Sequence, residues 1–363
     1  MKSLATYFGI FSFLLLSFSC GNADDDVELD LDFGDGLGLG ETVDDCLDFP
    51  ESDLVLSIQE QYTTLPGKVS IFFKVSDTDG NPVSGLTADQ FTIYEQGRND
   101  ECFNTISASE SYARISPNSQ IFNANTLLVL DLSNSVLSSS LDELKTASVS
   151  FVNNVMPTTT DESYKMAIYW FDGEDELHLL NDLTSVKQDL IDAINSISDD
   201  ISDDPSTDLY GAVIKSTDIA EDLLEESIKE DIIGAASVVI FTDGTDQASR
   251  YTKDAALDKV DDASANISFF TIGLGTEIDT EVLSEIGKTY SVFAGNAEEL
   301  ENTFNDISLK ISERANSFYL FEYCSPKRDG SGDNNLVIQV VDGNLQGAVQ
   351  TKFSADGFTG GCE

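Results

Sequence analysis

Residues 123–316 alternate between short apolar runs and segments with helical spacing, and this alternation constrains the fold more than any other feature of the sequence. The apolar runs are TLLVLDL, KMAIYWF, SVVIFTD, ISFFTIGLG and a shorter fifth, SVFAG. Between them, apolar residues recur every three or four positions, as in Leu141, Leu144, Phe151, Val152 and Val155, in Val186, Leu190, Ile194 and Ile197, and in Ile219, Leu223 and Ile228. Apolar strands that alternate with amphipathic helices predict an α/β fold, a doubly wound and mostly parallel sheet covered on both faces.

The segments on either side of this α/β domain have the pattern of β structure. Residues 46–122 contain KVSIFFKVSDTDGNPVSGLTADQFTIYEQG, which reads as strand, turn and strand. Residues 317–363 contain three further candidates, SFYLFEYC, NNLVIQVVDG and GAVQTKFSA. Because neither segment has enough strands for a sandwich of its own, we expect the two to form one β-sandwich in which the α/β domain is inserted.

The N-terminus has the pattern of an export signal. Residues 1–20, MKSLATYFGIFSFLLLSFSC, combine a lysine, an apolar and serine-containing run and a boundary cysteine, and the run is short for a membrane span. Its end resembles the lipobox of bacterial lipoproteins, which implies lipidation of Cys20, although Phe18 departs from the strictest pattern. Residues 21–45 are rich in glycine and aspartate, predict a flexible tether, and resemble the surface-export tethers of Bacteroidetes lipoproteins.

Four cysteines remain once Cys20 is assigned to lipid, namely Cys46, Cys102, Cys324 and Cys362. An even number in an exported chain indicates disulfides. Three pairings are open, and we favour Cys46 with Cys102 and Cys324 with Cys362. All four cysteines lie outside the α/β domain.

The charge of the chain excludes one class of partner. Its 363 residues include 66 acidic and 19 basic side chains, a net charge of −47. Such a surface repels phosphate backbones, so we expect no nucleic-acid partner. The acidic residues otherwise indicate a strongly hydrated surface.

Polar residues gather where the apolar runs end. Asp131 closes the first run and is followed at alternate positions by Ser133 and Ser135. Thr207 lies in PSTDLYGA before a helix, and Asp243 ends the run in VVIFTDGTD. Since ligands of open α/β sheets bind beyond the carboxyl ends of the strands, we expect these five oxygen-bearing side chains to meet at one edge of the sheet.

The pattern of Asp-x-Ser-x-Ser, a loop threonine and a strand-end aspartate resembles the metal-ion-dependent adhesion site (MIDAS) of von Willebrand factor type A (vWA) domains. The resemblance covers the whole α/β domain, with all five residues in the family's order. The preceding DxxGNPVxGLTxxQFTIYEQG stretch looks like the β segment before such domains in many bacterial proteins.

The resemblance implies a function as well as a fold. It implies that Ser133, Ser135 and Thr207 contact the metal directly, that Asp131 and Asp243 act partly through water, and that a carboxylate from a partner fills the open position. Hard oxygen ligands of this kind suit Mg²⁺, or else Mn²⁺ or Ca²⁺. We therefore expect a non-enzymatic adhesion module on a lipid-anchored protein of the bacterial outer membrane or cell surface, with a protein or glycan ligand that supplies an acidic group. The alternative is a scaffolding lipoprotein whose vWA domain docks a neighbouring subunit.

Rival chemistries fit the sequence less well. A phosphoryl-accepting role for Asp131 requires a second aspartate where Ser133 stands. The sequence has a single histidine, His178, and no G-x-S-x-G motif, which disfavours a histidine zinc site and a serine hydrolase, and we expect His178 at the surface of a hairpin. Trp170 and Tyr169 fit a core better than a ligand platform. DDISDDPS, residues 199–206, fits a solvated acidic loop better than a calcium site.

Overall fold

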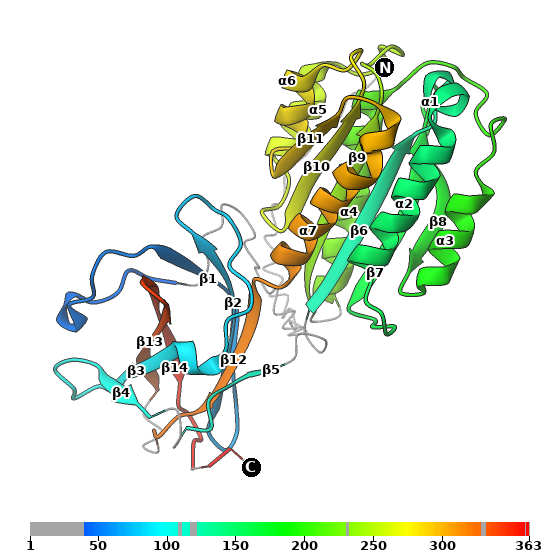
Figure 1. The fold of residues 1–363 in the computed structure, drawn as a ribbon. Coiled ribbons are helices and arrows are strands. Elements are labelled where there is room, and N and C mark those ends of the chain that lie inside the picture. The colour runs from blue at the N-terminus through cyan, green and yellow to red at the C-terminus, as the bar shows by residue number, and fades with distance from the viewer. Residues whose placement is uncertain are drawn as a thin grey trace, which may run out of the picture. The chain divides into compact units, whose positions relative to one another are not determined.

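The structure, a computed structural model, describes residues 40–107, 111–116, 122–229, 232–327, 332–359 and 361–362. Its largest sheet has six strands in the order β11-β10-β9-β6-β7-β8 (Figure 1). The strands are β6 (Phe122–Asp131), β7 (Tyr164–Phe171), β8 (His178–Thr184), β9 (Ile233–Thr242), β10 (Ile267–Leu274) and β11 (Tyr290–Ala294). All neighbouring pairs are parallel except β7 and β8. The predicted mostly parallel, doubly wound sheet is confirmed, with the antiparallel edge strand β8 in addition.

Helices cover both faces of this sheet. The helices are α1 (Asn134–Ser139), α2 (Leu141–Val155), α3 (Lys187–Ser196), α4 (Leu209–Lys229), α5 (Lys253–Asp261), α6 (Thr280–Ile286) and α7 (Leu300–Ala315). One core contains buried residues of α2, α3 and α7, and the other contains buried residues of α4, α5 and α6. Leu128 and Leu130 of β6 belong to the first core, whereas Leu127 and Val129 belong to the second. This division explains why β6 is apolar at every position rather than at alternate ones.

The buried stripe of α4 differs from the predicted one. Ile219 and Leu223 are only partly buried, and the residues nearest the sheet are mostly small, such as Ala212, Ser216 and Ala220. Small side chains allow the helix backbone to approach the sheet closely. A search for large apolar residues therefore locates the edge of this stripe and misses its centre.

Strands from both ends of the chain form two further sheets. Their orders are β1-β2-β12-β5 and β14-β13-β3-β4, and every pairing in them is antiparallel. The strands are β1 (Leu54–Thr64), β2 (Lys68–Asp77), β3 (Phe91–Gln96), β4 (Asn104–Ile106), β5 (Arg114–Ser116), β12 (Phe318–Cys324), β13 (Asp333–Asp342) and β14 (Leu345–Ser354). Because β12 pairs with β2 and β13 pairs with β3, each sheet needs strands from both sides of the α/β insertion. One core joins residues of both sheets, including Phe73, Phe321 and Ile338.

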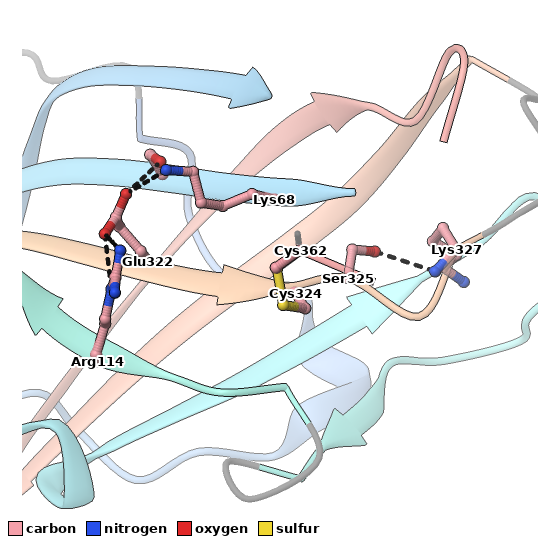
Figure 2. Close-up of a disulfide and its surroundings, with 8 residues drawn as sticks. Lys68, Arg114, Glu322, Cys324, Ser325, Lys327 and Cys362 are labelled. Atoms are coloured by element: carbon pink, nitrogen blue, oxygen red, sulfur yellow. Dashed lines mark hydrogen bonds and ion pairs between the residues drawn. A yellow bond between two sulfur atoms is a disulfide. The ribbon is translucent and has the colours of Figure 1, made fainter. Parts of the chain in front are cut away.

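Two disulfides connect parts of this β structure. The bonded pairs are Cys46 with Cys102 and Cys324 with Cys362, with Cα atoms 5.9 and 5.6 Å apart, which is the pairing favoured from the sequence. Figure 2 shows the second bond at the end of β12, two residues from Glu322. The Glu322 carboxylate is buried and accepts from Lys68 Nζ at 2.8 Å and from Arg114 Nη2 at 2.7 Å. These two cations compensate the charge that Glu322 brings into the sheet.

The N-terminal expectations are only partly covered by the structure. The signal peptide, Cys20 and residues 21–39 of the predicted tether lie outside the described residues. Residues 40–45 differ from the prediction, since Glu41 pairs with Gln350 of β14 and a short 3-10 helix begins at Asp45. The backbone hydrogen bonds between Glu41 and Gln350 hold this last part of the predicted tether against β14. Amino-acid composition does not reveal such pairing. No helix among the described residues is long and apolar enough to cross a membrane.

Candidate functional site

The five predicted site residues lie at the carboxyl ends of β6 and β9 and in the loop before α4. The chain reaches β7 on one side of β6 and later crosses to β9 on the other, so the strand order reverses between β6 and β9. At such a point the loops after neighbouring strands diverge and leave room for a ligand. Asp131 is the last residue of β6, and Asp243 directly follows β9. Thr207 lies two residues before α4.

Asp131 is completely buried and is held by two hydrogen bonds. Its Oδ1 accepts from the backbone N–H of Ser133 at 2.9 Å, and its Oδ2 accepts from Thr242 Oγ1 at 2.6 Å. Thr242 is the last residue of β9 and is itself fully buried. The Asp131 carboxylate is therefore fixed between its own turn and the neighbouring strand.

The two serines connect Asp131 to Asp243. Ser133 Oγ lies 3.3 Å from Ser135 Oγ, and Ser135 Oγ donates to Asp243 Oδ1 at 2.8 Å. Ser133 precedes α1, so its extended backbone turns the chain away from the strand direction. This turn brings the hydroxyls of two residues at alternate positions within 3.3 Å of each other.

Backbone contacts position the Thr207 loop beside the other two. The Thr207 carbonyl accepts from the N–H groups of Gln247 and Ala248 at 2.9 and 3.0 Å, and the Asn134 N–H donates to the Pro205 carbonyl at 3.4 Å. Thr207 itself is buried. The structure thus brings Asp131, Ser133, Ser135 and Asp243 into one hydrogen-bonded group, with the Thr207 loop bonded to the loops on both sides.

The residue after Thr207 explains the local sequence TDLYGA. Asp208 is buried, accepts from the Gly211 N–H at 3.3 Å, and donates its own N–H to the Asp172 carbonyl at 2.7 Å. A Cβ atom at Gly211 would lie 2.0 Å from Asp208 Oδ2, so any larger residue there would displace this carboxylate. Asp208 therefore fixes the start of α4 and the position of Thr207 before it.

The electrostatics of the site suit a cation. Burial, assisted by the charge of Asp243, raises the pKa of Asp131 to about 7 against the effect of its hydrogen bonds. Burial also raises the pKa of Asp243, and the charge of Glu277 adds to this effect. Within the described ranges, neither Asp131 nor Asp243 takes part in an ion pair with a basic side chain. Two close carboxylates without a compensating base, together with three hydroxyl-bearing residues, fit a hard divalent ion.

Two other sequence interpretations have definite outcomes. Trp170 is buried and Tyr169 is half-buried, so both belong to the packed interior. His178 begins β8, which forms a hairpin with β7, but it is not a free surface residue. Its ring stacks on Trp170 with centroids 4.0 Å apart. The register of β7 on β8 places His178 opposite Trp170, and a single sequence does not reveal that register.

Comparison with known proteins agrees with this architecture. Residues 125–307 match the model of the von Willebrand factor type A domain family, which is half of the chain. The chain belongs to this family. No curated protein matches the chain significantly.

Three solved structures similar to this chain come from different organisms. BatB from Bacteroides thetaiotaomicron has 18% identity and a TM-score of 0.41, and the match covers 53% of this chain and 99% of that chain. Proximal thread matrix protein 1 of the mussel byssus, with a zinc-occupied MIDAS motif, has 15% identity and a TM-score of 0.40, with 59% of this chain and 49% of that chain covered. Manganese-loaded TRAP protein of Plasmodium vivax has 14% identity and a TM-score of 0.41, with 70% of this chain and 99% of that chain covered. The match spans about half the length of the mussel protein.

Proposed function

We propose that the vWA domain is a metal-dependent binding module that holds one divalent cation and, through it, a carboxylate of a partner. The observation that carries the proposal is the hydrogen-bonded group of Asp131, Ser133, Ser135 and Asp243 at the switch point of the sheet. In this group Asp131 and Ser133 are buried, Asp243 is partly buried and Ser135 is exposed. These residues, together with Thr207, would hold the ion. When bound, the ion supplies a positive charge that neutral hydroxyl ligands leave largely uncompensated.

The charge of the chain adds to the argument. A net charge of −47 repels an acidic partner at long range. An acidic partner therefore needs a local positive charge in order to bind, and the metal provides it at the edge of the sheet. Removal of the metal leaves only repulsion, so binding should be lost completely rather than weakened.

The setting of the module is part of the proposal. The signal-like N-terminus and Cys20 support a lipid-anchored protein at the bacterial outer membrane or cell surface, with a protein or glycan ligand. The alternative is a scaffolding lipoprotein in which the same domain docks a neighbouring subunit and the metal only stabilises the fold.

Capture of partners from envelope extracts tests the proposal. The wild type should retain partners in Mg²⁺ and release them in chelator while circular dichroism shows the fold intact. Asp131→Asn should retain none, and Asp254→Asn, which makes the same charge change at an exposed position on α5, should behave as the wild type. Partners that stay bound in chelator would refute the proposal. Unfolding on metal removal would favour the scaffolding alternative.

A further inference from the structure

The carboxyl end of β7 carries a second cluster of metal-binding side chains, separate from the five residues already described. Asp172, Glu174 and His178 place one ligand atom each within 4.8 Å of one another. His178 Nε2 lies 4.0 Å from Asp172 Oδ1 and 3.7 Å from Glu174 Oε2. The β7–β8 hairpin brings the three together, because the strands place His178 opposite Trp170, two residues before Asp172.

The histidine nitrogen in this cluster lacks a hydrogen-bond partner. His178 Nε2 is buried and accepts or donates no hydrogen bond. A buried polar atom without a partner has a free-energy cost that protein structures rarely leave uncompensated. Its ring orientation is fixed by the stacking on Trp170, with an interplanar angle of 12°. The nitrogen thus points at two carboxylates without a hydrogen bond to either.

The Asp172 carboxylate is positioned in advance. It is almost wholly buried, its Oδ1 accepts from the Glu174 N–H at 2.8 Å, and its Oδ2 accepts from Ser202 Oγ at 2.7 Å. Among the ion pairs of the described chain, the only ones of Asp172 and Glu174 are those with His178. Hydrogen bonds that orient a carboxylate in this way are typical of the groups around metal ligands.

We propose that Asp172, Glu174 and His178 form a second metal site, which takes a transition-metal dication such as Zn²⁺. Bonds of about 2.1 Å from a tetrahedral ion would place ligand atoms about 3.4 Å apart. The histidine nitrogen lies 3.7 and 4.0 Å from the two carboxylate oxygens, and all three atoms lie within 4.8 Å of one another, so small side-chain shifts would bring them to these distances. One imidazole nitrogen with two carboxylates favours Zn²⁺, Co²⁺ or Mn²⁺ over Mg²⁺ or Ca²⁺, which prefer oxygen ligands alone. The partly exposed Glu174 leaves the ion open to water as a further ligand.

Such an ion would also tie the hairpin to the Thr207 loop. The side chain of Asp172 accepts a hydrogen bond from Ser202, which lies in the acidic segment of residues 199–206, and its carbonyl accepts from the N–H of Asp208, which follows that segment. The acidic segment that the sequence presented as a solvated loop therefore contacts a candidate metal ligand. The second site does not depend on a metal at Asp131, because the two share no ligand.

The single tryptophan of the chain offers a direct test, since Trp170 lies against His178. The full chain is titrated with Zn²⁺ or Co²⁺ in excess Mg²⁺, which competes for the proposed site at Asp131, while Trp170 fluorescence and the heat of binding are recorded. We expect one ion per chain with a saturable change in fluorescence, in the wild type and in Asp131→Asn alike. Mg²⁺ alone should produce no such change.

Variants make the assignment specific. His178→Phe preserves an aromatic ring against Trp170 and removes the nitrogen, and Glu174→Gln removes a half-exposed charge. Each should weaken Zn²⁺ binding at least tenfold by calorimetry, whereas Glu176→Gln, an exposed acid on the same hairpin, should leave it unchanged. A Zn²⁺ affinity in His178→Phe and Glu174→Gln equal to that of the wild type would overturn the proposal. The absence of saturable Zn²⁺ binding by the wild type in excess Mg²⁺ would also overturn it. In either case the cluster would be only a histidine packed beside two carboxylates.

Discussion

Thr242→Val is the substitution that best separates the positioning of Asp131 from its presence. Thr242 donates to Asp131 Oδ2 at 2.6 Å from a fully buried position, and valine has nearly the same shape without the hydroxyl. A hydrogen bond to a charged acceptor contributes about 1.5–3 kcal/mol. Its loss disfavours the ionised carboxylate and raises the pKa of Asp131 further above its ordinary value. We expect Mg²⁺ or Mn²⁺ affinity near neutral pH to fall at least about tenfold, which corresponds to about 1.4 kcal/mol.

The pH dependence of this loss tests its cause. The metal binds the ionised carboxylate, and the Thr242 hydrogen bond stabilises the ionised form with and without metal. The difference in affinity between variant and wild type should therefore be large at about pH 6.5, where a proton must leave Asp131 for the metal to bind, and should be much smaller at about pH 9. Calorimetric titrations at both pH values measure it.

A matched control excludes a general effect of removing a buried hydroxyl. Thr271 on β10, two strands from the β6 strand that carries Asp131, is equally buried and donates to the Leu283 carbonyl at 2.8 Å. Thr271→Val should reduce stability without changing metal affinity. A loss in Thr242→Val that is the same at both pH values, or no loss at all, would show that the hydrogen bond does not tune Asp131.

Three further predictions concern charge, covalent links and anchoring. The free energy of unfolding of the metal-free protein should decrease as the pH rises from about 4 to about 7, because over this range the folded state holds a proton on Asp131 that the unfolded state has lost. Chemical denaturation at several pH values measures this decrease, which should be smaller in Asp131→Asn. Peptide mass spectrometry without reduction should find no free thiol in either disulfide pair. The disulfides close loops of 56 and 38 residues, and each should stabilise the folded chain by about 4 kcal/mol. A midpoint of urea unfolding that is unchanged after reduction would contradict this. Cys20→Ser should move the protein from the membrane fraction to the soluble fraction, and continued membrane association would refute lipidation.

The alternation of strands and helices along the chain was predictable because the buried runs are long and apolar. The runs in β6, β7, β9 and β10 contain more consecutive apolar residues than a strand that is buried on one face only. The helices between them show apolar residues at intervals of three or four positions. Strand β8 was missed because HLLNDLT is an edge strand with polar positions and half-buried residues. Strand β1 was missed for a similar reason, since its second half is only partly buried and polar.

The part of the site that is defined by residue type and by order along the chain was predictable, whereas the residues that position it were not. Asp131, Ser133, Ser135, Thr207 and Asp243 stand in a recognisable pattern, but Thr242 and Asp208, which position them, resemble any strand-end threonine or helix-start aspartate. The register of β7 on β8 decides that His178 faces Asp172. Non-local contacts of this kind leave no trace in one sequence, except that Asp172 ends a buried strand in the same way as Asp131 and Asp243.

The most direct test of the metal site is a calorimetric titration of the full chain with Mg²⁺, compared between the wild type and Asp131→Ala. Asp131 is the last residue of β6 and belongs to a polar group outside the apolar cores, so its truncation should preserve the fold, which circular dichroism checks. The account predicts one Mg²⁺ per chain in the wild type and no measurable binding in Asp131→Ala, with Ser133→Ala intermediate. Equal binding of Mg²⁺ by folded Asp131→Ala would contradict the assignment of these residues as a metal site.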